Sequence, residues 1–244
     1  MKFKNNIIEI FVIFGALLLL FYSSDPVIYS DSGRYIDGGP LDPPMYSKII
    51  KIMLSMFETL NSVVVLQTLL ISFAIIYFTR TIAIHFDLGI LTKVFISLLL
   101  FLPILQFYNN LLTEPLGYAF SLFFVSSVFK LIFNYNYQNL FWVTFFIVAL
   151  LLTRNQFMFL YPVVLLLYIG IFILFRSKST ATWLIASFLS VFLIHNSLIF
   201  LNTYVKDDSF NTQKLTYVSL GPFFYTYLDA IYISTNKDIK LFKN

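Results

Sequence analysis

The sequence contains no cysteine and only two histidines. The absence of cysteine excludes disulfides, thiolate metal sites and cysteine nucleophiles. His85 and His195 lie far apart along the chain, which argues against a zinc site. Charged residues are also scarce, at only 11% of the chain. The net charge of +4 comes without a basic stripe outside the apolar runs, so the sequence argues against a nucleic-acid partner.

Apolar side chains are abundant instead. Of the 244 residues, 59% are hydrophobic, and 30 are Phe and 16 are Tyr. No soluble single domain needs so much apolar surface, so the sequence predicts the lipid bilayer as the surroundings of this chain. The apolar runs are long and unbroken, which indicates helices.

The predicted fold is an all-α, polytopic transmembrane helix bundle. Crossing the hydrocarbon core takes about 20 mostly apolar residues. The first run is expected to be an uncleaved anchor, because residues 21–25 lack a small-x-small cleavage site. About seven spans are expected, of which the fifth is the shortest, at residues 7–22, 63–78, 90–107, 115–133, 140–152, 158–175 and 182–201.

The basic residues predict the orientation of these spans. With the N-terminus in the cytoplasm, every inner segment carries lysine or arginine, which is the positive-inside pattern. We therefore expect a multi-pass protein of the cell membrane, with the remaining charged loops on the extracytoplasmic side. The inner basic residues are Lys2, Lys4, Arg80, Lys93, Lys130, Arg176 and Lys178.

Residues 1–201 are predicted to form one transmembrane domain. Its first outer loop, residues 23–60, is expected to hold two juxtamembrane helices, at about 27–37 and 44–59. The second has apolar residues at three- and four-residue spacing, which is typical of a helix lying on a membrane surface. Residues 202–244 are predicted to be an extracytoplasmic tail or cap, or the start of a continuation.

Three charged residues are the main candidates for chemistry, because charge near lipid is costly and often marks a site. Glu114 and Arg154 both lie where an outer loop meets a span, so both can reach one outer cavity. Alternatively, each is an interfacial charge that reaches water or complements a helix dipole. Asp31 lies in the loop that would cover this cavity, and its alternative role is a helix N-cap.

Around these residues the chain resembles the GT-C superfamily of membrane glycosyltransferases, which includes protein O-mannosyltransferases and lipid A aminoarabinose transferases. The resemblance lies in the order of four short segments, spread over residues 1–201. They are Asp31-Ser32-Gly33-Arg34-Tyr35, Asp42-Pro43-Pro44-Met45-Tyr46, Leu112-Thr113-Glu114-Pro115 and Leu152-Thr153-Arg154.

This resemblance implies transfer of a sugar from a polyprenyl-phosphate carrier to a lipid, glycan or protein acceptor on the outer face, usually with inversion. It implies that Asp31 is the base or helps to hold a metal, and that Glu114 orients the acceptor or the metal. Arg154 would stabilise the leaving phosphate. Some members of the superfamily use a divalent ion and others none, and no other cofactor is expected. Further substrate contacts are assigned to Arg34, Tyr35, Asp37 and Tyr46.

Two other functions share these sequence features. One is a lipid-linked saccharide flippase or polymerase-like membrane protein, which predicts broken helices near the bilayer midplane. Only Pro103 and Pro162 are candidates for such breaks. The other is a noncatalytic membrane subunit, which predicts that Asp31, Glu114 and Arg154 do not converge.

Overall fold

The structure is a computed structural model that describes residues 7–22, 25–29, 32–37 and 43–206. These residues form helices joined by short connections, with one isolated β-bridge, so the predicted all-α class is confirmed for this part of the chain. The helices are α1 (Ile7–Tyr22), α2 (Ser32–Asp37), α3 (Pro44–Phe57), α4 (Asn61–His85), α5 (Ile90–Phe101), α6 (Ile104–Phe107), α7 (Glu114–Phe133), α8 (Tyr137–Thr153), the 3-10 helix η2 (Asn155–Phe159), α9 (Leu160–Phe175) and α10 (Lys178–Lys206).

Five helical stretches are long and apolar enough to cross a membrane: α4, α5 with α6, α7, η2 with α9, and α10. This confirms the prediction of several apolar membrane-length helices. α1 and α8 are apolar too, but they are shorter, with 16 and 17 residues. A helix of 17 residues is about 25 Å long, whereas the hydrocarbon core is about 30 Å thick. The predicted count of seven spans includes α1 and α8, whereas the count of five leaves these two shorter helices out.

The outer faces of the helices are as apolar as the interior. On α9, Leu166 and Leu174 are exposed, whereas Val164 and Ile171 on the same helix are buried. A helix that is hydrophobic all round lies in a large core or in a membrane. The exposed apolar faces therefore suit contact with acyl chains.

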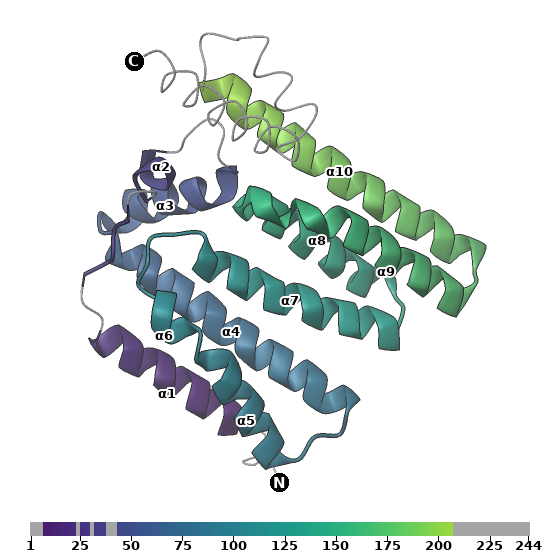
Figure 1. The fold of residues 1–244 in the computed structure, drawn as a ribbon, viewed down its shortest axis with the longest axis horizontal. Coiled ribbons are helices and arrows are strands. Elements are labelled where there is room, and N and C mark those ends of the chain that lie inside the picture. The colour runs from purple at the N-terminus through teal and green to yellow at the C-terminus, as the bar shows by residue number, and fades with distance from the viewer. Residues whose placement is uncertain (1–6, 23–24, 30–31, 38–42, 207–244) are drawn as a thin grey trace, which may run out of the picture.

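Figure 1 shows how the helices are arranged. α4 and α7 run in the same direction along the centre, and α8 runs back beside α7. α1 and α5 pack against α4, and α10 packs against α8 and α9. One buried cluster joins α7 and α8 to α3, α9 and α10, and a second joins α1 and α4 to the α5–α6 region and α7.

The course of the chain gives the bundle two different ends. The ends of α4, α7 and α9 meet the starts of α5, α8 and α10 at one end (Figure 1). α2, α3, the start of α7 and the end of α8 lie at the other. We call the first the basic end, because its helix termini carry Lys93, Lys130, Arg176 and Lys178.

The boundary predicted for the first juxtamembrane helix is wrong. It was expected at residues 27–37, but α2 begins at Ser32. Val27 pairs instead with the segment before α7: its N–H donates to the Asn109 carbonyl at 3.0 Å, and its carbonyl accepts from the Leu111 N–H at 3.1 Å. A backbone that forms such a bridge is extended, so it cannot also be helical.

Two further boundaries differ for local reasons. The second juxtamembrane helix, predicted at 44–59, ends at Phe57, where Glu58 adopts the left-handed conformation with φ 56°. The predicted span 90–107 is interrupted between Phe101 and Ile104. Pro103 lies in this break and has no N–H for the next helical hydrogen bond.

Candidate functional site

Two of the predicted site residues meet at the end of the bundle opposite the basic end. Glu114 is the first residue of α7, and Arg154 lies between α8 and η2 in an extended conformation, with φ −155° and ψ 135°. The Arg154 Nη1 is 2.5 Å from the Glu114 Oε1. The two side chains are 32% and 40% exposed, respectively, so the ion pair is not sealed from the surroundings.

The two oxygens of the Glu114 carboxylate have different environments. Oε1 accepts from Arg154, whereas Oε2 is buried and has no hydrogen-bond partner. The hydroxyl oxygens of Thr113 and Ser47 are also buried without a partner. An unpaired buried polar atom costs about 1–3 kcal/mol, so such atoms need an explanation. One explanation is a polar ligand whose hydroxyl or amino groups donate to these oxygens.

A buried hydrogen-bond network holds the segment that precedes Glu114 against α3 and α4. The Tyr46 hydroxyl, on α3, donates to the Gln67 Oε1, on α4, at 2.7 Å. The Gln67 Nε2 donates to the carbonyl oxygens of Asn110 at 3.2 Å and Tyr108 at 3.4 Å. This network, which we call the Gln67 network, therefore joins α3 and α4 to the segment that leads into Glu114.

Tyr46 and Tyr35 lie beside this network. Tyr46 is fully buried, and the Tyr35 ring meets it edge-on, with 5.5 Å between the ring centroids. Burial raises the pKa of Tyr46 well above its usual range, and the nearby Glu114 and Tyr35 raise it further. Tyr46 is therefore a neutral hydrogen-bond donor, and its hydroxyl is occupied by Gln67 rather than open to a substrate.

A glycine allows the segment of Arg154 to approach α7. Gly117 lies one turn after Glu114, and a Cβ added there would lie 3.1 Å from the Phe157 ring of η2. The Phe157 ring would have to move by a few tenths of an ångström to admit even this one carbon, so its position depends on the missing side chain of Gly117. This contact explains how Arg154, forty residues from Glu114 in sequence, reaches its carboxylate.

The other predicted site residues are described only in part. Asp31 and Asp42 lie outside the described residues, Asp31 directly before Ser32. Arg34 and Asp37 belong to α2, but their side chains are outside the described part. The structure thus brings Glu114 and Arg154 together and places Tyr35 and Tyr46 near them, while the role of each stays a prediction.

Sequence reasoning did not identify Gln67 or the polar residues Ser47 and Thr113. Gln67 could have been found, because an amide inside the apolar run 61–85 needs a hydrogen-bond partner within the protein. Ser47 and Thr113 gave no comparable signal, since Ser and Thr are common in helices and can bond their own backbone. Within the residues that the structure describes, no group of three or more His, Asp or Glu side chains could hold a metal ion.

Comparisons of the chain with models of protein families, with curated proteins and with solved structures find no match.

Proposed function

We propose that the chain is a membrane glycosyltransferase that moves a sugar from a polyprenyl-phosphate carrier to a lipid, glycan or protein acceptor on the outer face of the membrane. The observation that carries the proposal is the pairing of Glu114 with Arg154 at the end opposite the basic end, with one buried carboxylate oxygen left unpartnered. This pair combines an anion-binding group with a hydrogen-bond acceptor, and both are needed to replace a phosphate by a hydroxyl.

Arg154 has the chemistry to bind the phosphate of the donor. A guanidinium has five N–H donors, and the Glu114 contact uses the Nη1 group. The remaining donors suit two phosphate oxygens, and they would stabilise the negative charge that forms on the leaving polyprenyl phosphate.

The acceptor hydroxyl would be held by the Glu114 Oε2 and deprotonated by the carboxylate of Asp31. The acceptor oxygen then bonds to the anomeric carbon as the bond from that carbon to the phosphate oxygen breaks, which inverts the configuration. The phosphate leaves with the electron pair, and Asp31 holds the proton. A divalent ion at Asp31 and Glu114 would supply further charge stabilisation where one is bound.

The topology that suits this reaction has seven spans, with α1 and α8 included. The basic end lies in the cytoplasm by the positive-inside rule, and α2 and α3, which lie at the same end of the bundle as Glu114, are then on the outer side. The polyprenyl tail of the donor would lie against the apolar surfaces of the spans.

The competing function is a noncatalytic membrane subunit in which Glu114 and Arg154 form a structural ion pair. The mutual contact of the two side chains favours it, because an ion pair needs no substrate to explain it. Activity measurements separate the two functions.

The test is sugar transfer in membranes that contain the chain, with polyprenyl phosphates carrying radiolabelled hexoses or aminopentoses. We expect transfer that is absent from matched membranes without the chain. Asp31→Asn should lower it at least about a hundredfold, as expected for loss of a general base. Glu58→Gln, an exposed acid on the same side of the bundle, should leave transfer unchanged. Full transfer in Asp31→Asn would remove Asp31 from the mechanism, and no transfer with any donor would favour the noncatalytic subunit.

A further inference from the structure

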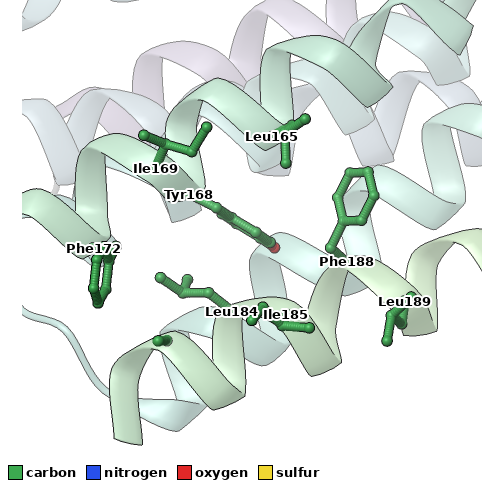
Figure 2. A pocket seen from close by; sticks show the side chains of 9 residues that line it. Leu165, Tyr168, Ile169, Phe172, Leu184, Ile185, Phe188 and Leu189 are labelled. Atoms are coloured by element: carbon green, nitrogen blue, oxygen red, sulfur yellow. The ribbon is translucent and has the colours of Figure 1, made fainter. Parts of the chain in front are cut away.

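A second feature of the bundle lies between α9 and α10, away from the Glu114 site. The two helices run antiparallel but leave an apolar groove between them with a volume of about 300 Å³. Figure 2 shows side chains of both helices facing this gap, with Tyr168 reaching from α9 toward α10. Tyr168 and Leu184 are buried and form the floor, whereas Leu165, Ile169 and Ile185 are exposed along the rim.

The groove offers almost no polar group to an occupant. Tyr168, which lines it, has its hydroxyl bonded to the Ser187 Oγ at 2.7 Å, and the Ser187 Oγ is 2.6 Å from the Thr144 Oγ1. Thr144 in turn donates to the Leu140 carbonyl at 2.8 Å. These hydroxyl groups of α8, α9 and α10 are therefore hydrogen-bonded to one another and leave no free polar group for an occupant. The part of an occupant that enters the groove must be hydrocarbon.

Positive charge lies at one end of the groove. On α9 the lining runs from Leu165 to Phe172, which is about 10 Å, and Arg176 follows Phe172 after about 6 Å more. Lys178 begins α10 just before the lining residue Ala181. Both basic side chains are exposed, and no ion pair with a described acid is found for either.

Aromatic side chains surround the same end. Tyr137 packs against Trp183 with 5.0 Å between the ring centroids, and Tyr135 packs against Phe175 at 5.3 Å. Tyr and Trp are enriched at the level of lipid headgroups. The basic turn between α9 and α10 therefore lies where a headgroup would be, with the apolar groove directly on its hydrocarbon side.

We propose that the α9–α10 groove binds one anionic phospholipid, with an acyl chain in the groove and the phosphate of the headgroup at Arg176 and Lys178. Charge complementarity selects this occupant: the Arg176 Nε donates only to the Ile173 carbonyl at 3.2 Å, so a lipid without net negative charge would leave the charge of the two basic residues uncompensated, and a headgroup at the opposite end of α9 would not reach them. The proposal does not depend on glycosyltransferase activity.

The test uses the full chain in bilayers of phosphatidylcholine with a minor fraction of phosphatidylglycerol. A phosphatidylglycerol with a photoreactive acyl chain should label peptides of α9 and α10, several-fold more than the same probe built on phosphatidylcholine. Arg176→Gln with Lys178→Gln should lower the phosphatidylglycerol labelling roughly tenfold or more, since each basic residue near an anionic headgroup contributes about a factor of five. Lys93→Gln, which removes a basic residue of α5 at the same end, should not change it.

A second variant tests the groove without altering charge or orientation. Ala181→Phe fills the groove and should lower labelling at α9 and α10 with both probes. Equal labelling by the two lipids, or unchanged labelling in the double variant, would overturn the proposal. So would displacement of the probe by polyprenyl phosphate at lower concentration than by phosphatidylglycerol, or crosslinks across the groove to a second copy of the chain.

Discussion

At the scale of single residues, the hydrogen bonds of buried polar side chains hold together the segments around the site. Gln67 pairs with one hydroxyl on α3 and with two carbonyls of the segment before α7. His195 on α10 has only one of its two ring nitrogens paired: Nδ1 is hydrogen-bonded to the Tyr161 hydroxyl at 2.8 Å, whereas the buried Nε2 has no partner. Networks of this kind stabilise a fold only when each member is paired.

Tyr46→Phe tests the Gln67 network. The change leaves the buried Gln67 Oε1 without a donor, so we expect the free energy of unfolding to fall by about 1–3 kcal/mol. Thermal unfolding in detergent measures it. Tyr137→Phe is the matched control, because the Tyr137 hydroxyl is exposed and makes only a long contact of 3.4 Å. Equal stability of Tyr46→Phe and the parent would contradict the role of the network.

The raised pKa of Tyr46 adds a dependence on pH. In the unfolded chain this phenol loses its proton near pH 10, whereas burial keeps it protonated in the folded chain. The folded state then holds more protons above pH 10, so stability falls as pH rises further. The parent should lose stability faster than Tyr46→Phe in this range, whereas near neutral pH the difference in stability between them should not change with pH.

At the scale of helices, close packing decides which charged residues meet. Gly117 lets the Phe157 ring lie against α7, and this approach brings η2 and Arg154 beside Glu114. Backbone hydrogen bonding has similar effects elsewhere. The helix breaks near Pro103, which has no N–H to donate, and Val27 is extended because its backbone pairs with the segment before α7.

Gly117→Leu tests this packing. The new side chain would collide with Phe157, so we expect a loss of about 1–3 kcal/mol in the free energy of unfolding, as for overpacked cores. Gly170→Leu is the control, because a Cβ at Gly170 meets nothing within 4 Å. Thermal unfolding of both variants decides the matter: the interpretation fails if the two lose the same stability.

At the scale of the whole molecule, the antiparallel course of the chain separates the basic end from the Glu114 site by the length of the bundle. Electrostatic bias during insertion would then place the two ends on opposite sides of the membrane. The proposed reaction and its lipid-linked donor both depend on this separation.

The absence of cysteine makes the sidedness easy to measure. Thr59→Cys places one thiol between α3 and α4, and Ser177→Cys places one between α9 and α10. With an impermeant maleimide on intact cells, we expect labelling of Thr59→Cys alone, and of Ser177→Cys only after permeabilisation. Both positions are exposed, so each serves as the control of the other. The reverse pattern would place the Glu114 site in the cytoplasm.

The sequence by itself determined the all-helical class and the approximate position of each long helix, because the length and apolarity of a helix that suits lipid are local properties. It also predicted that Glu114 and Arg154 both lie where an outer loop meets a span. Only the tertiary structure decided that these two side chains touch, that Gln67 joins three segments and that α9 and α10 leave a groove between them. Contacts between residues forty positions apart depend on how helices pack, and packing depends on side-chain shapes that no single segment contains.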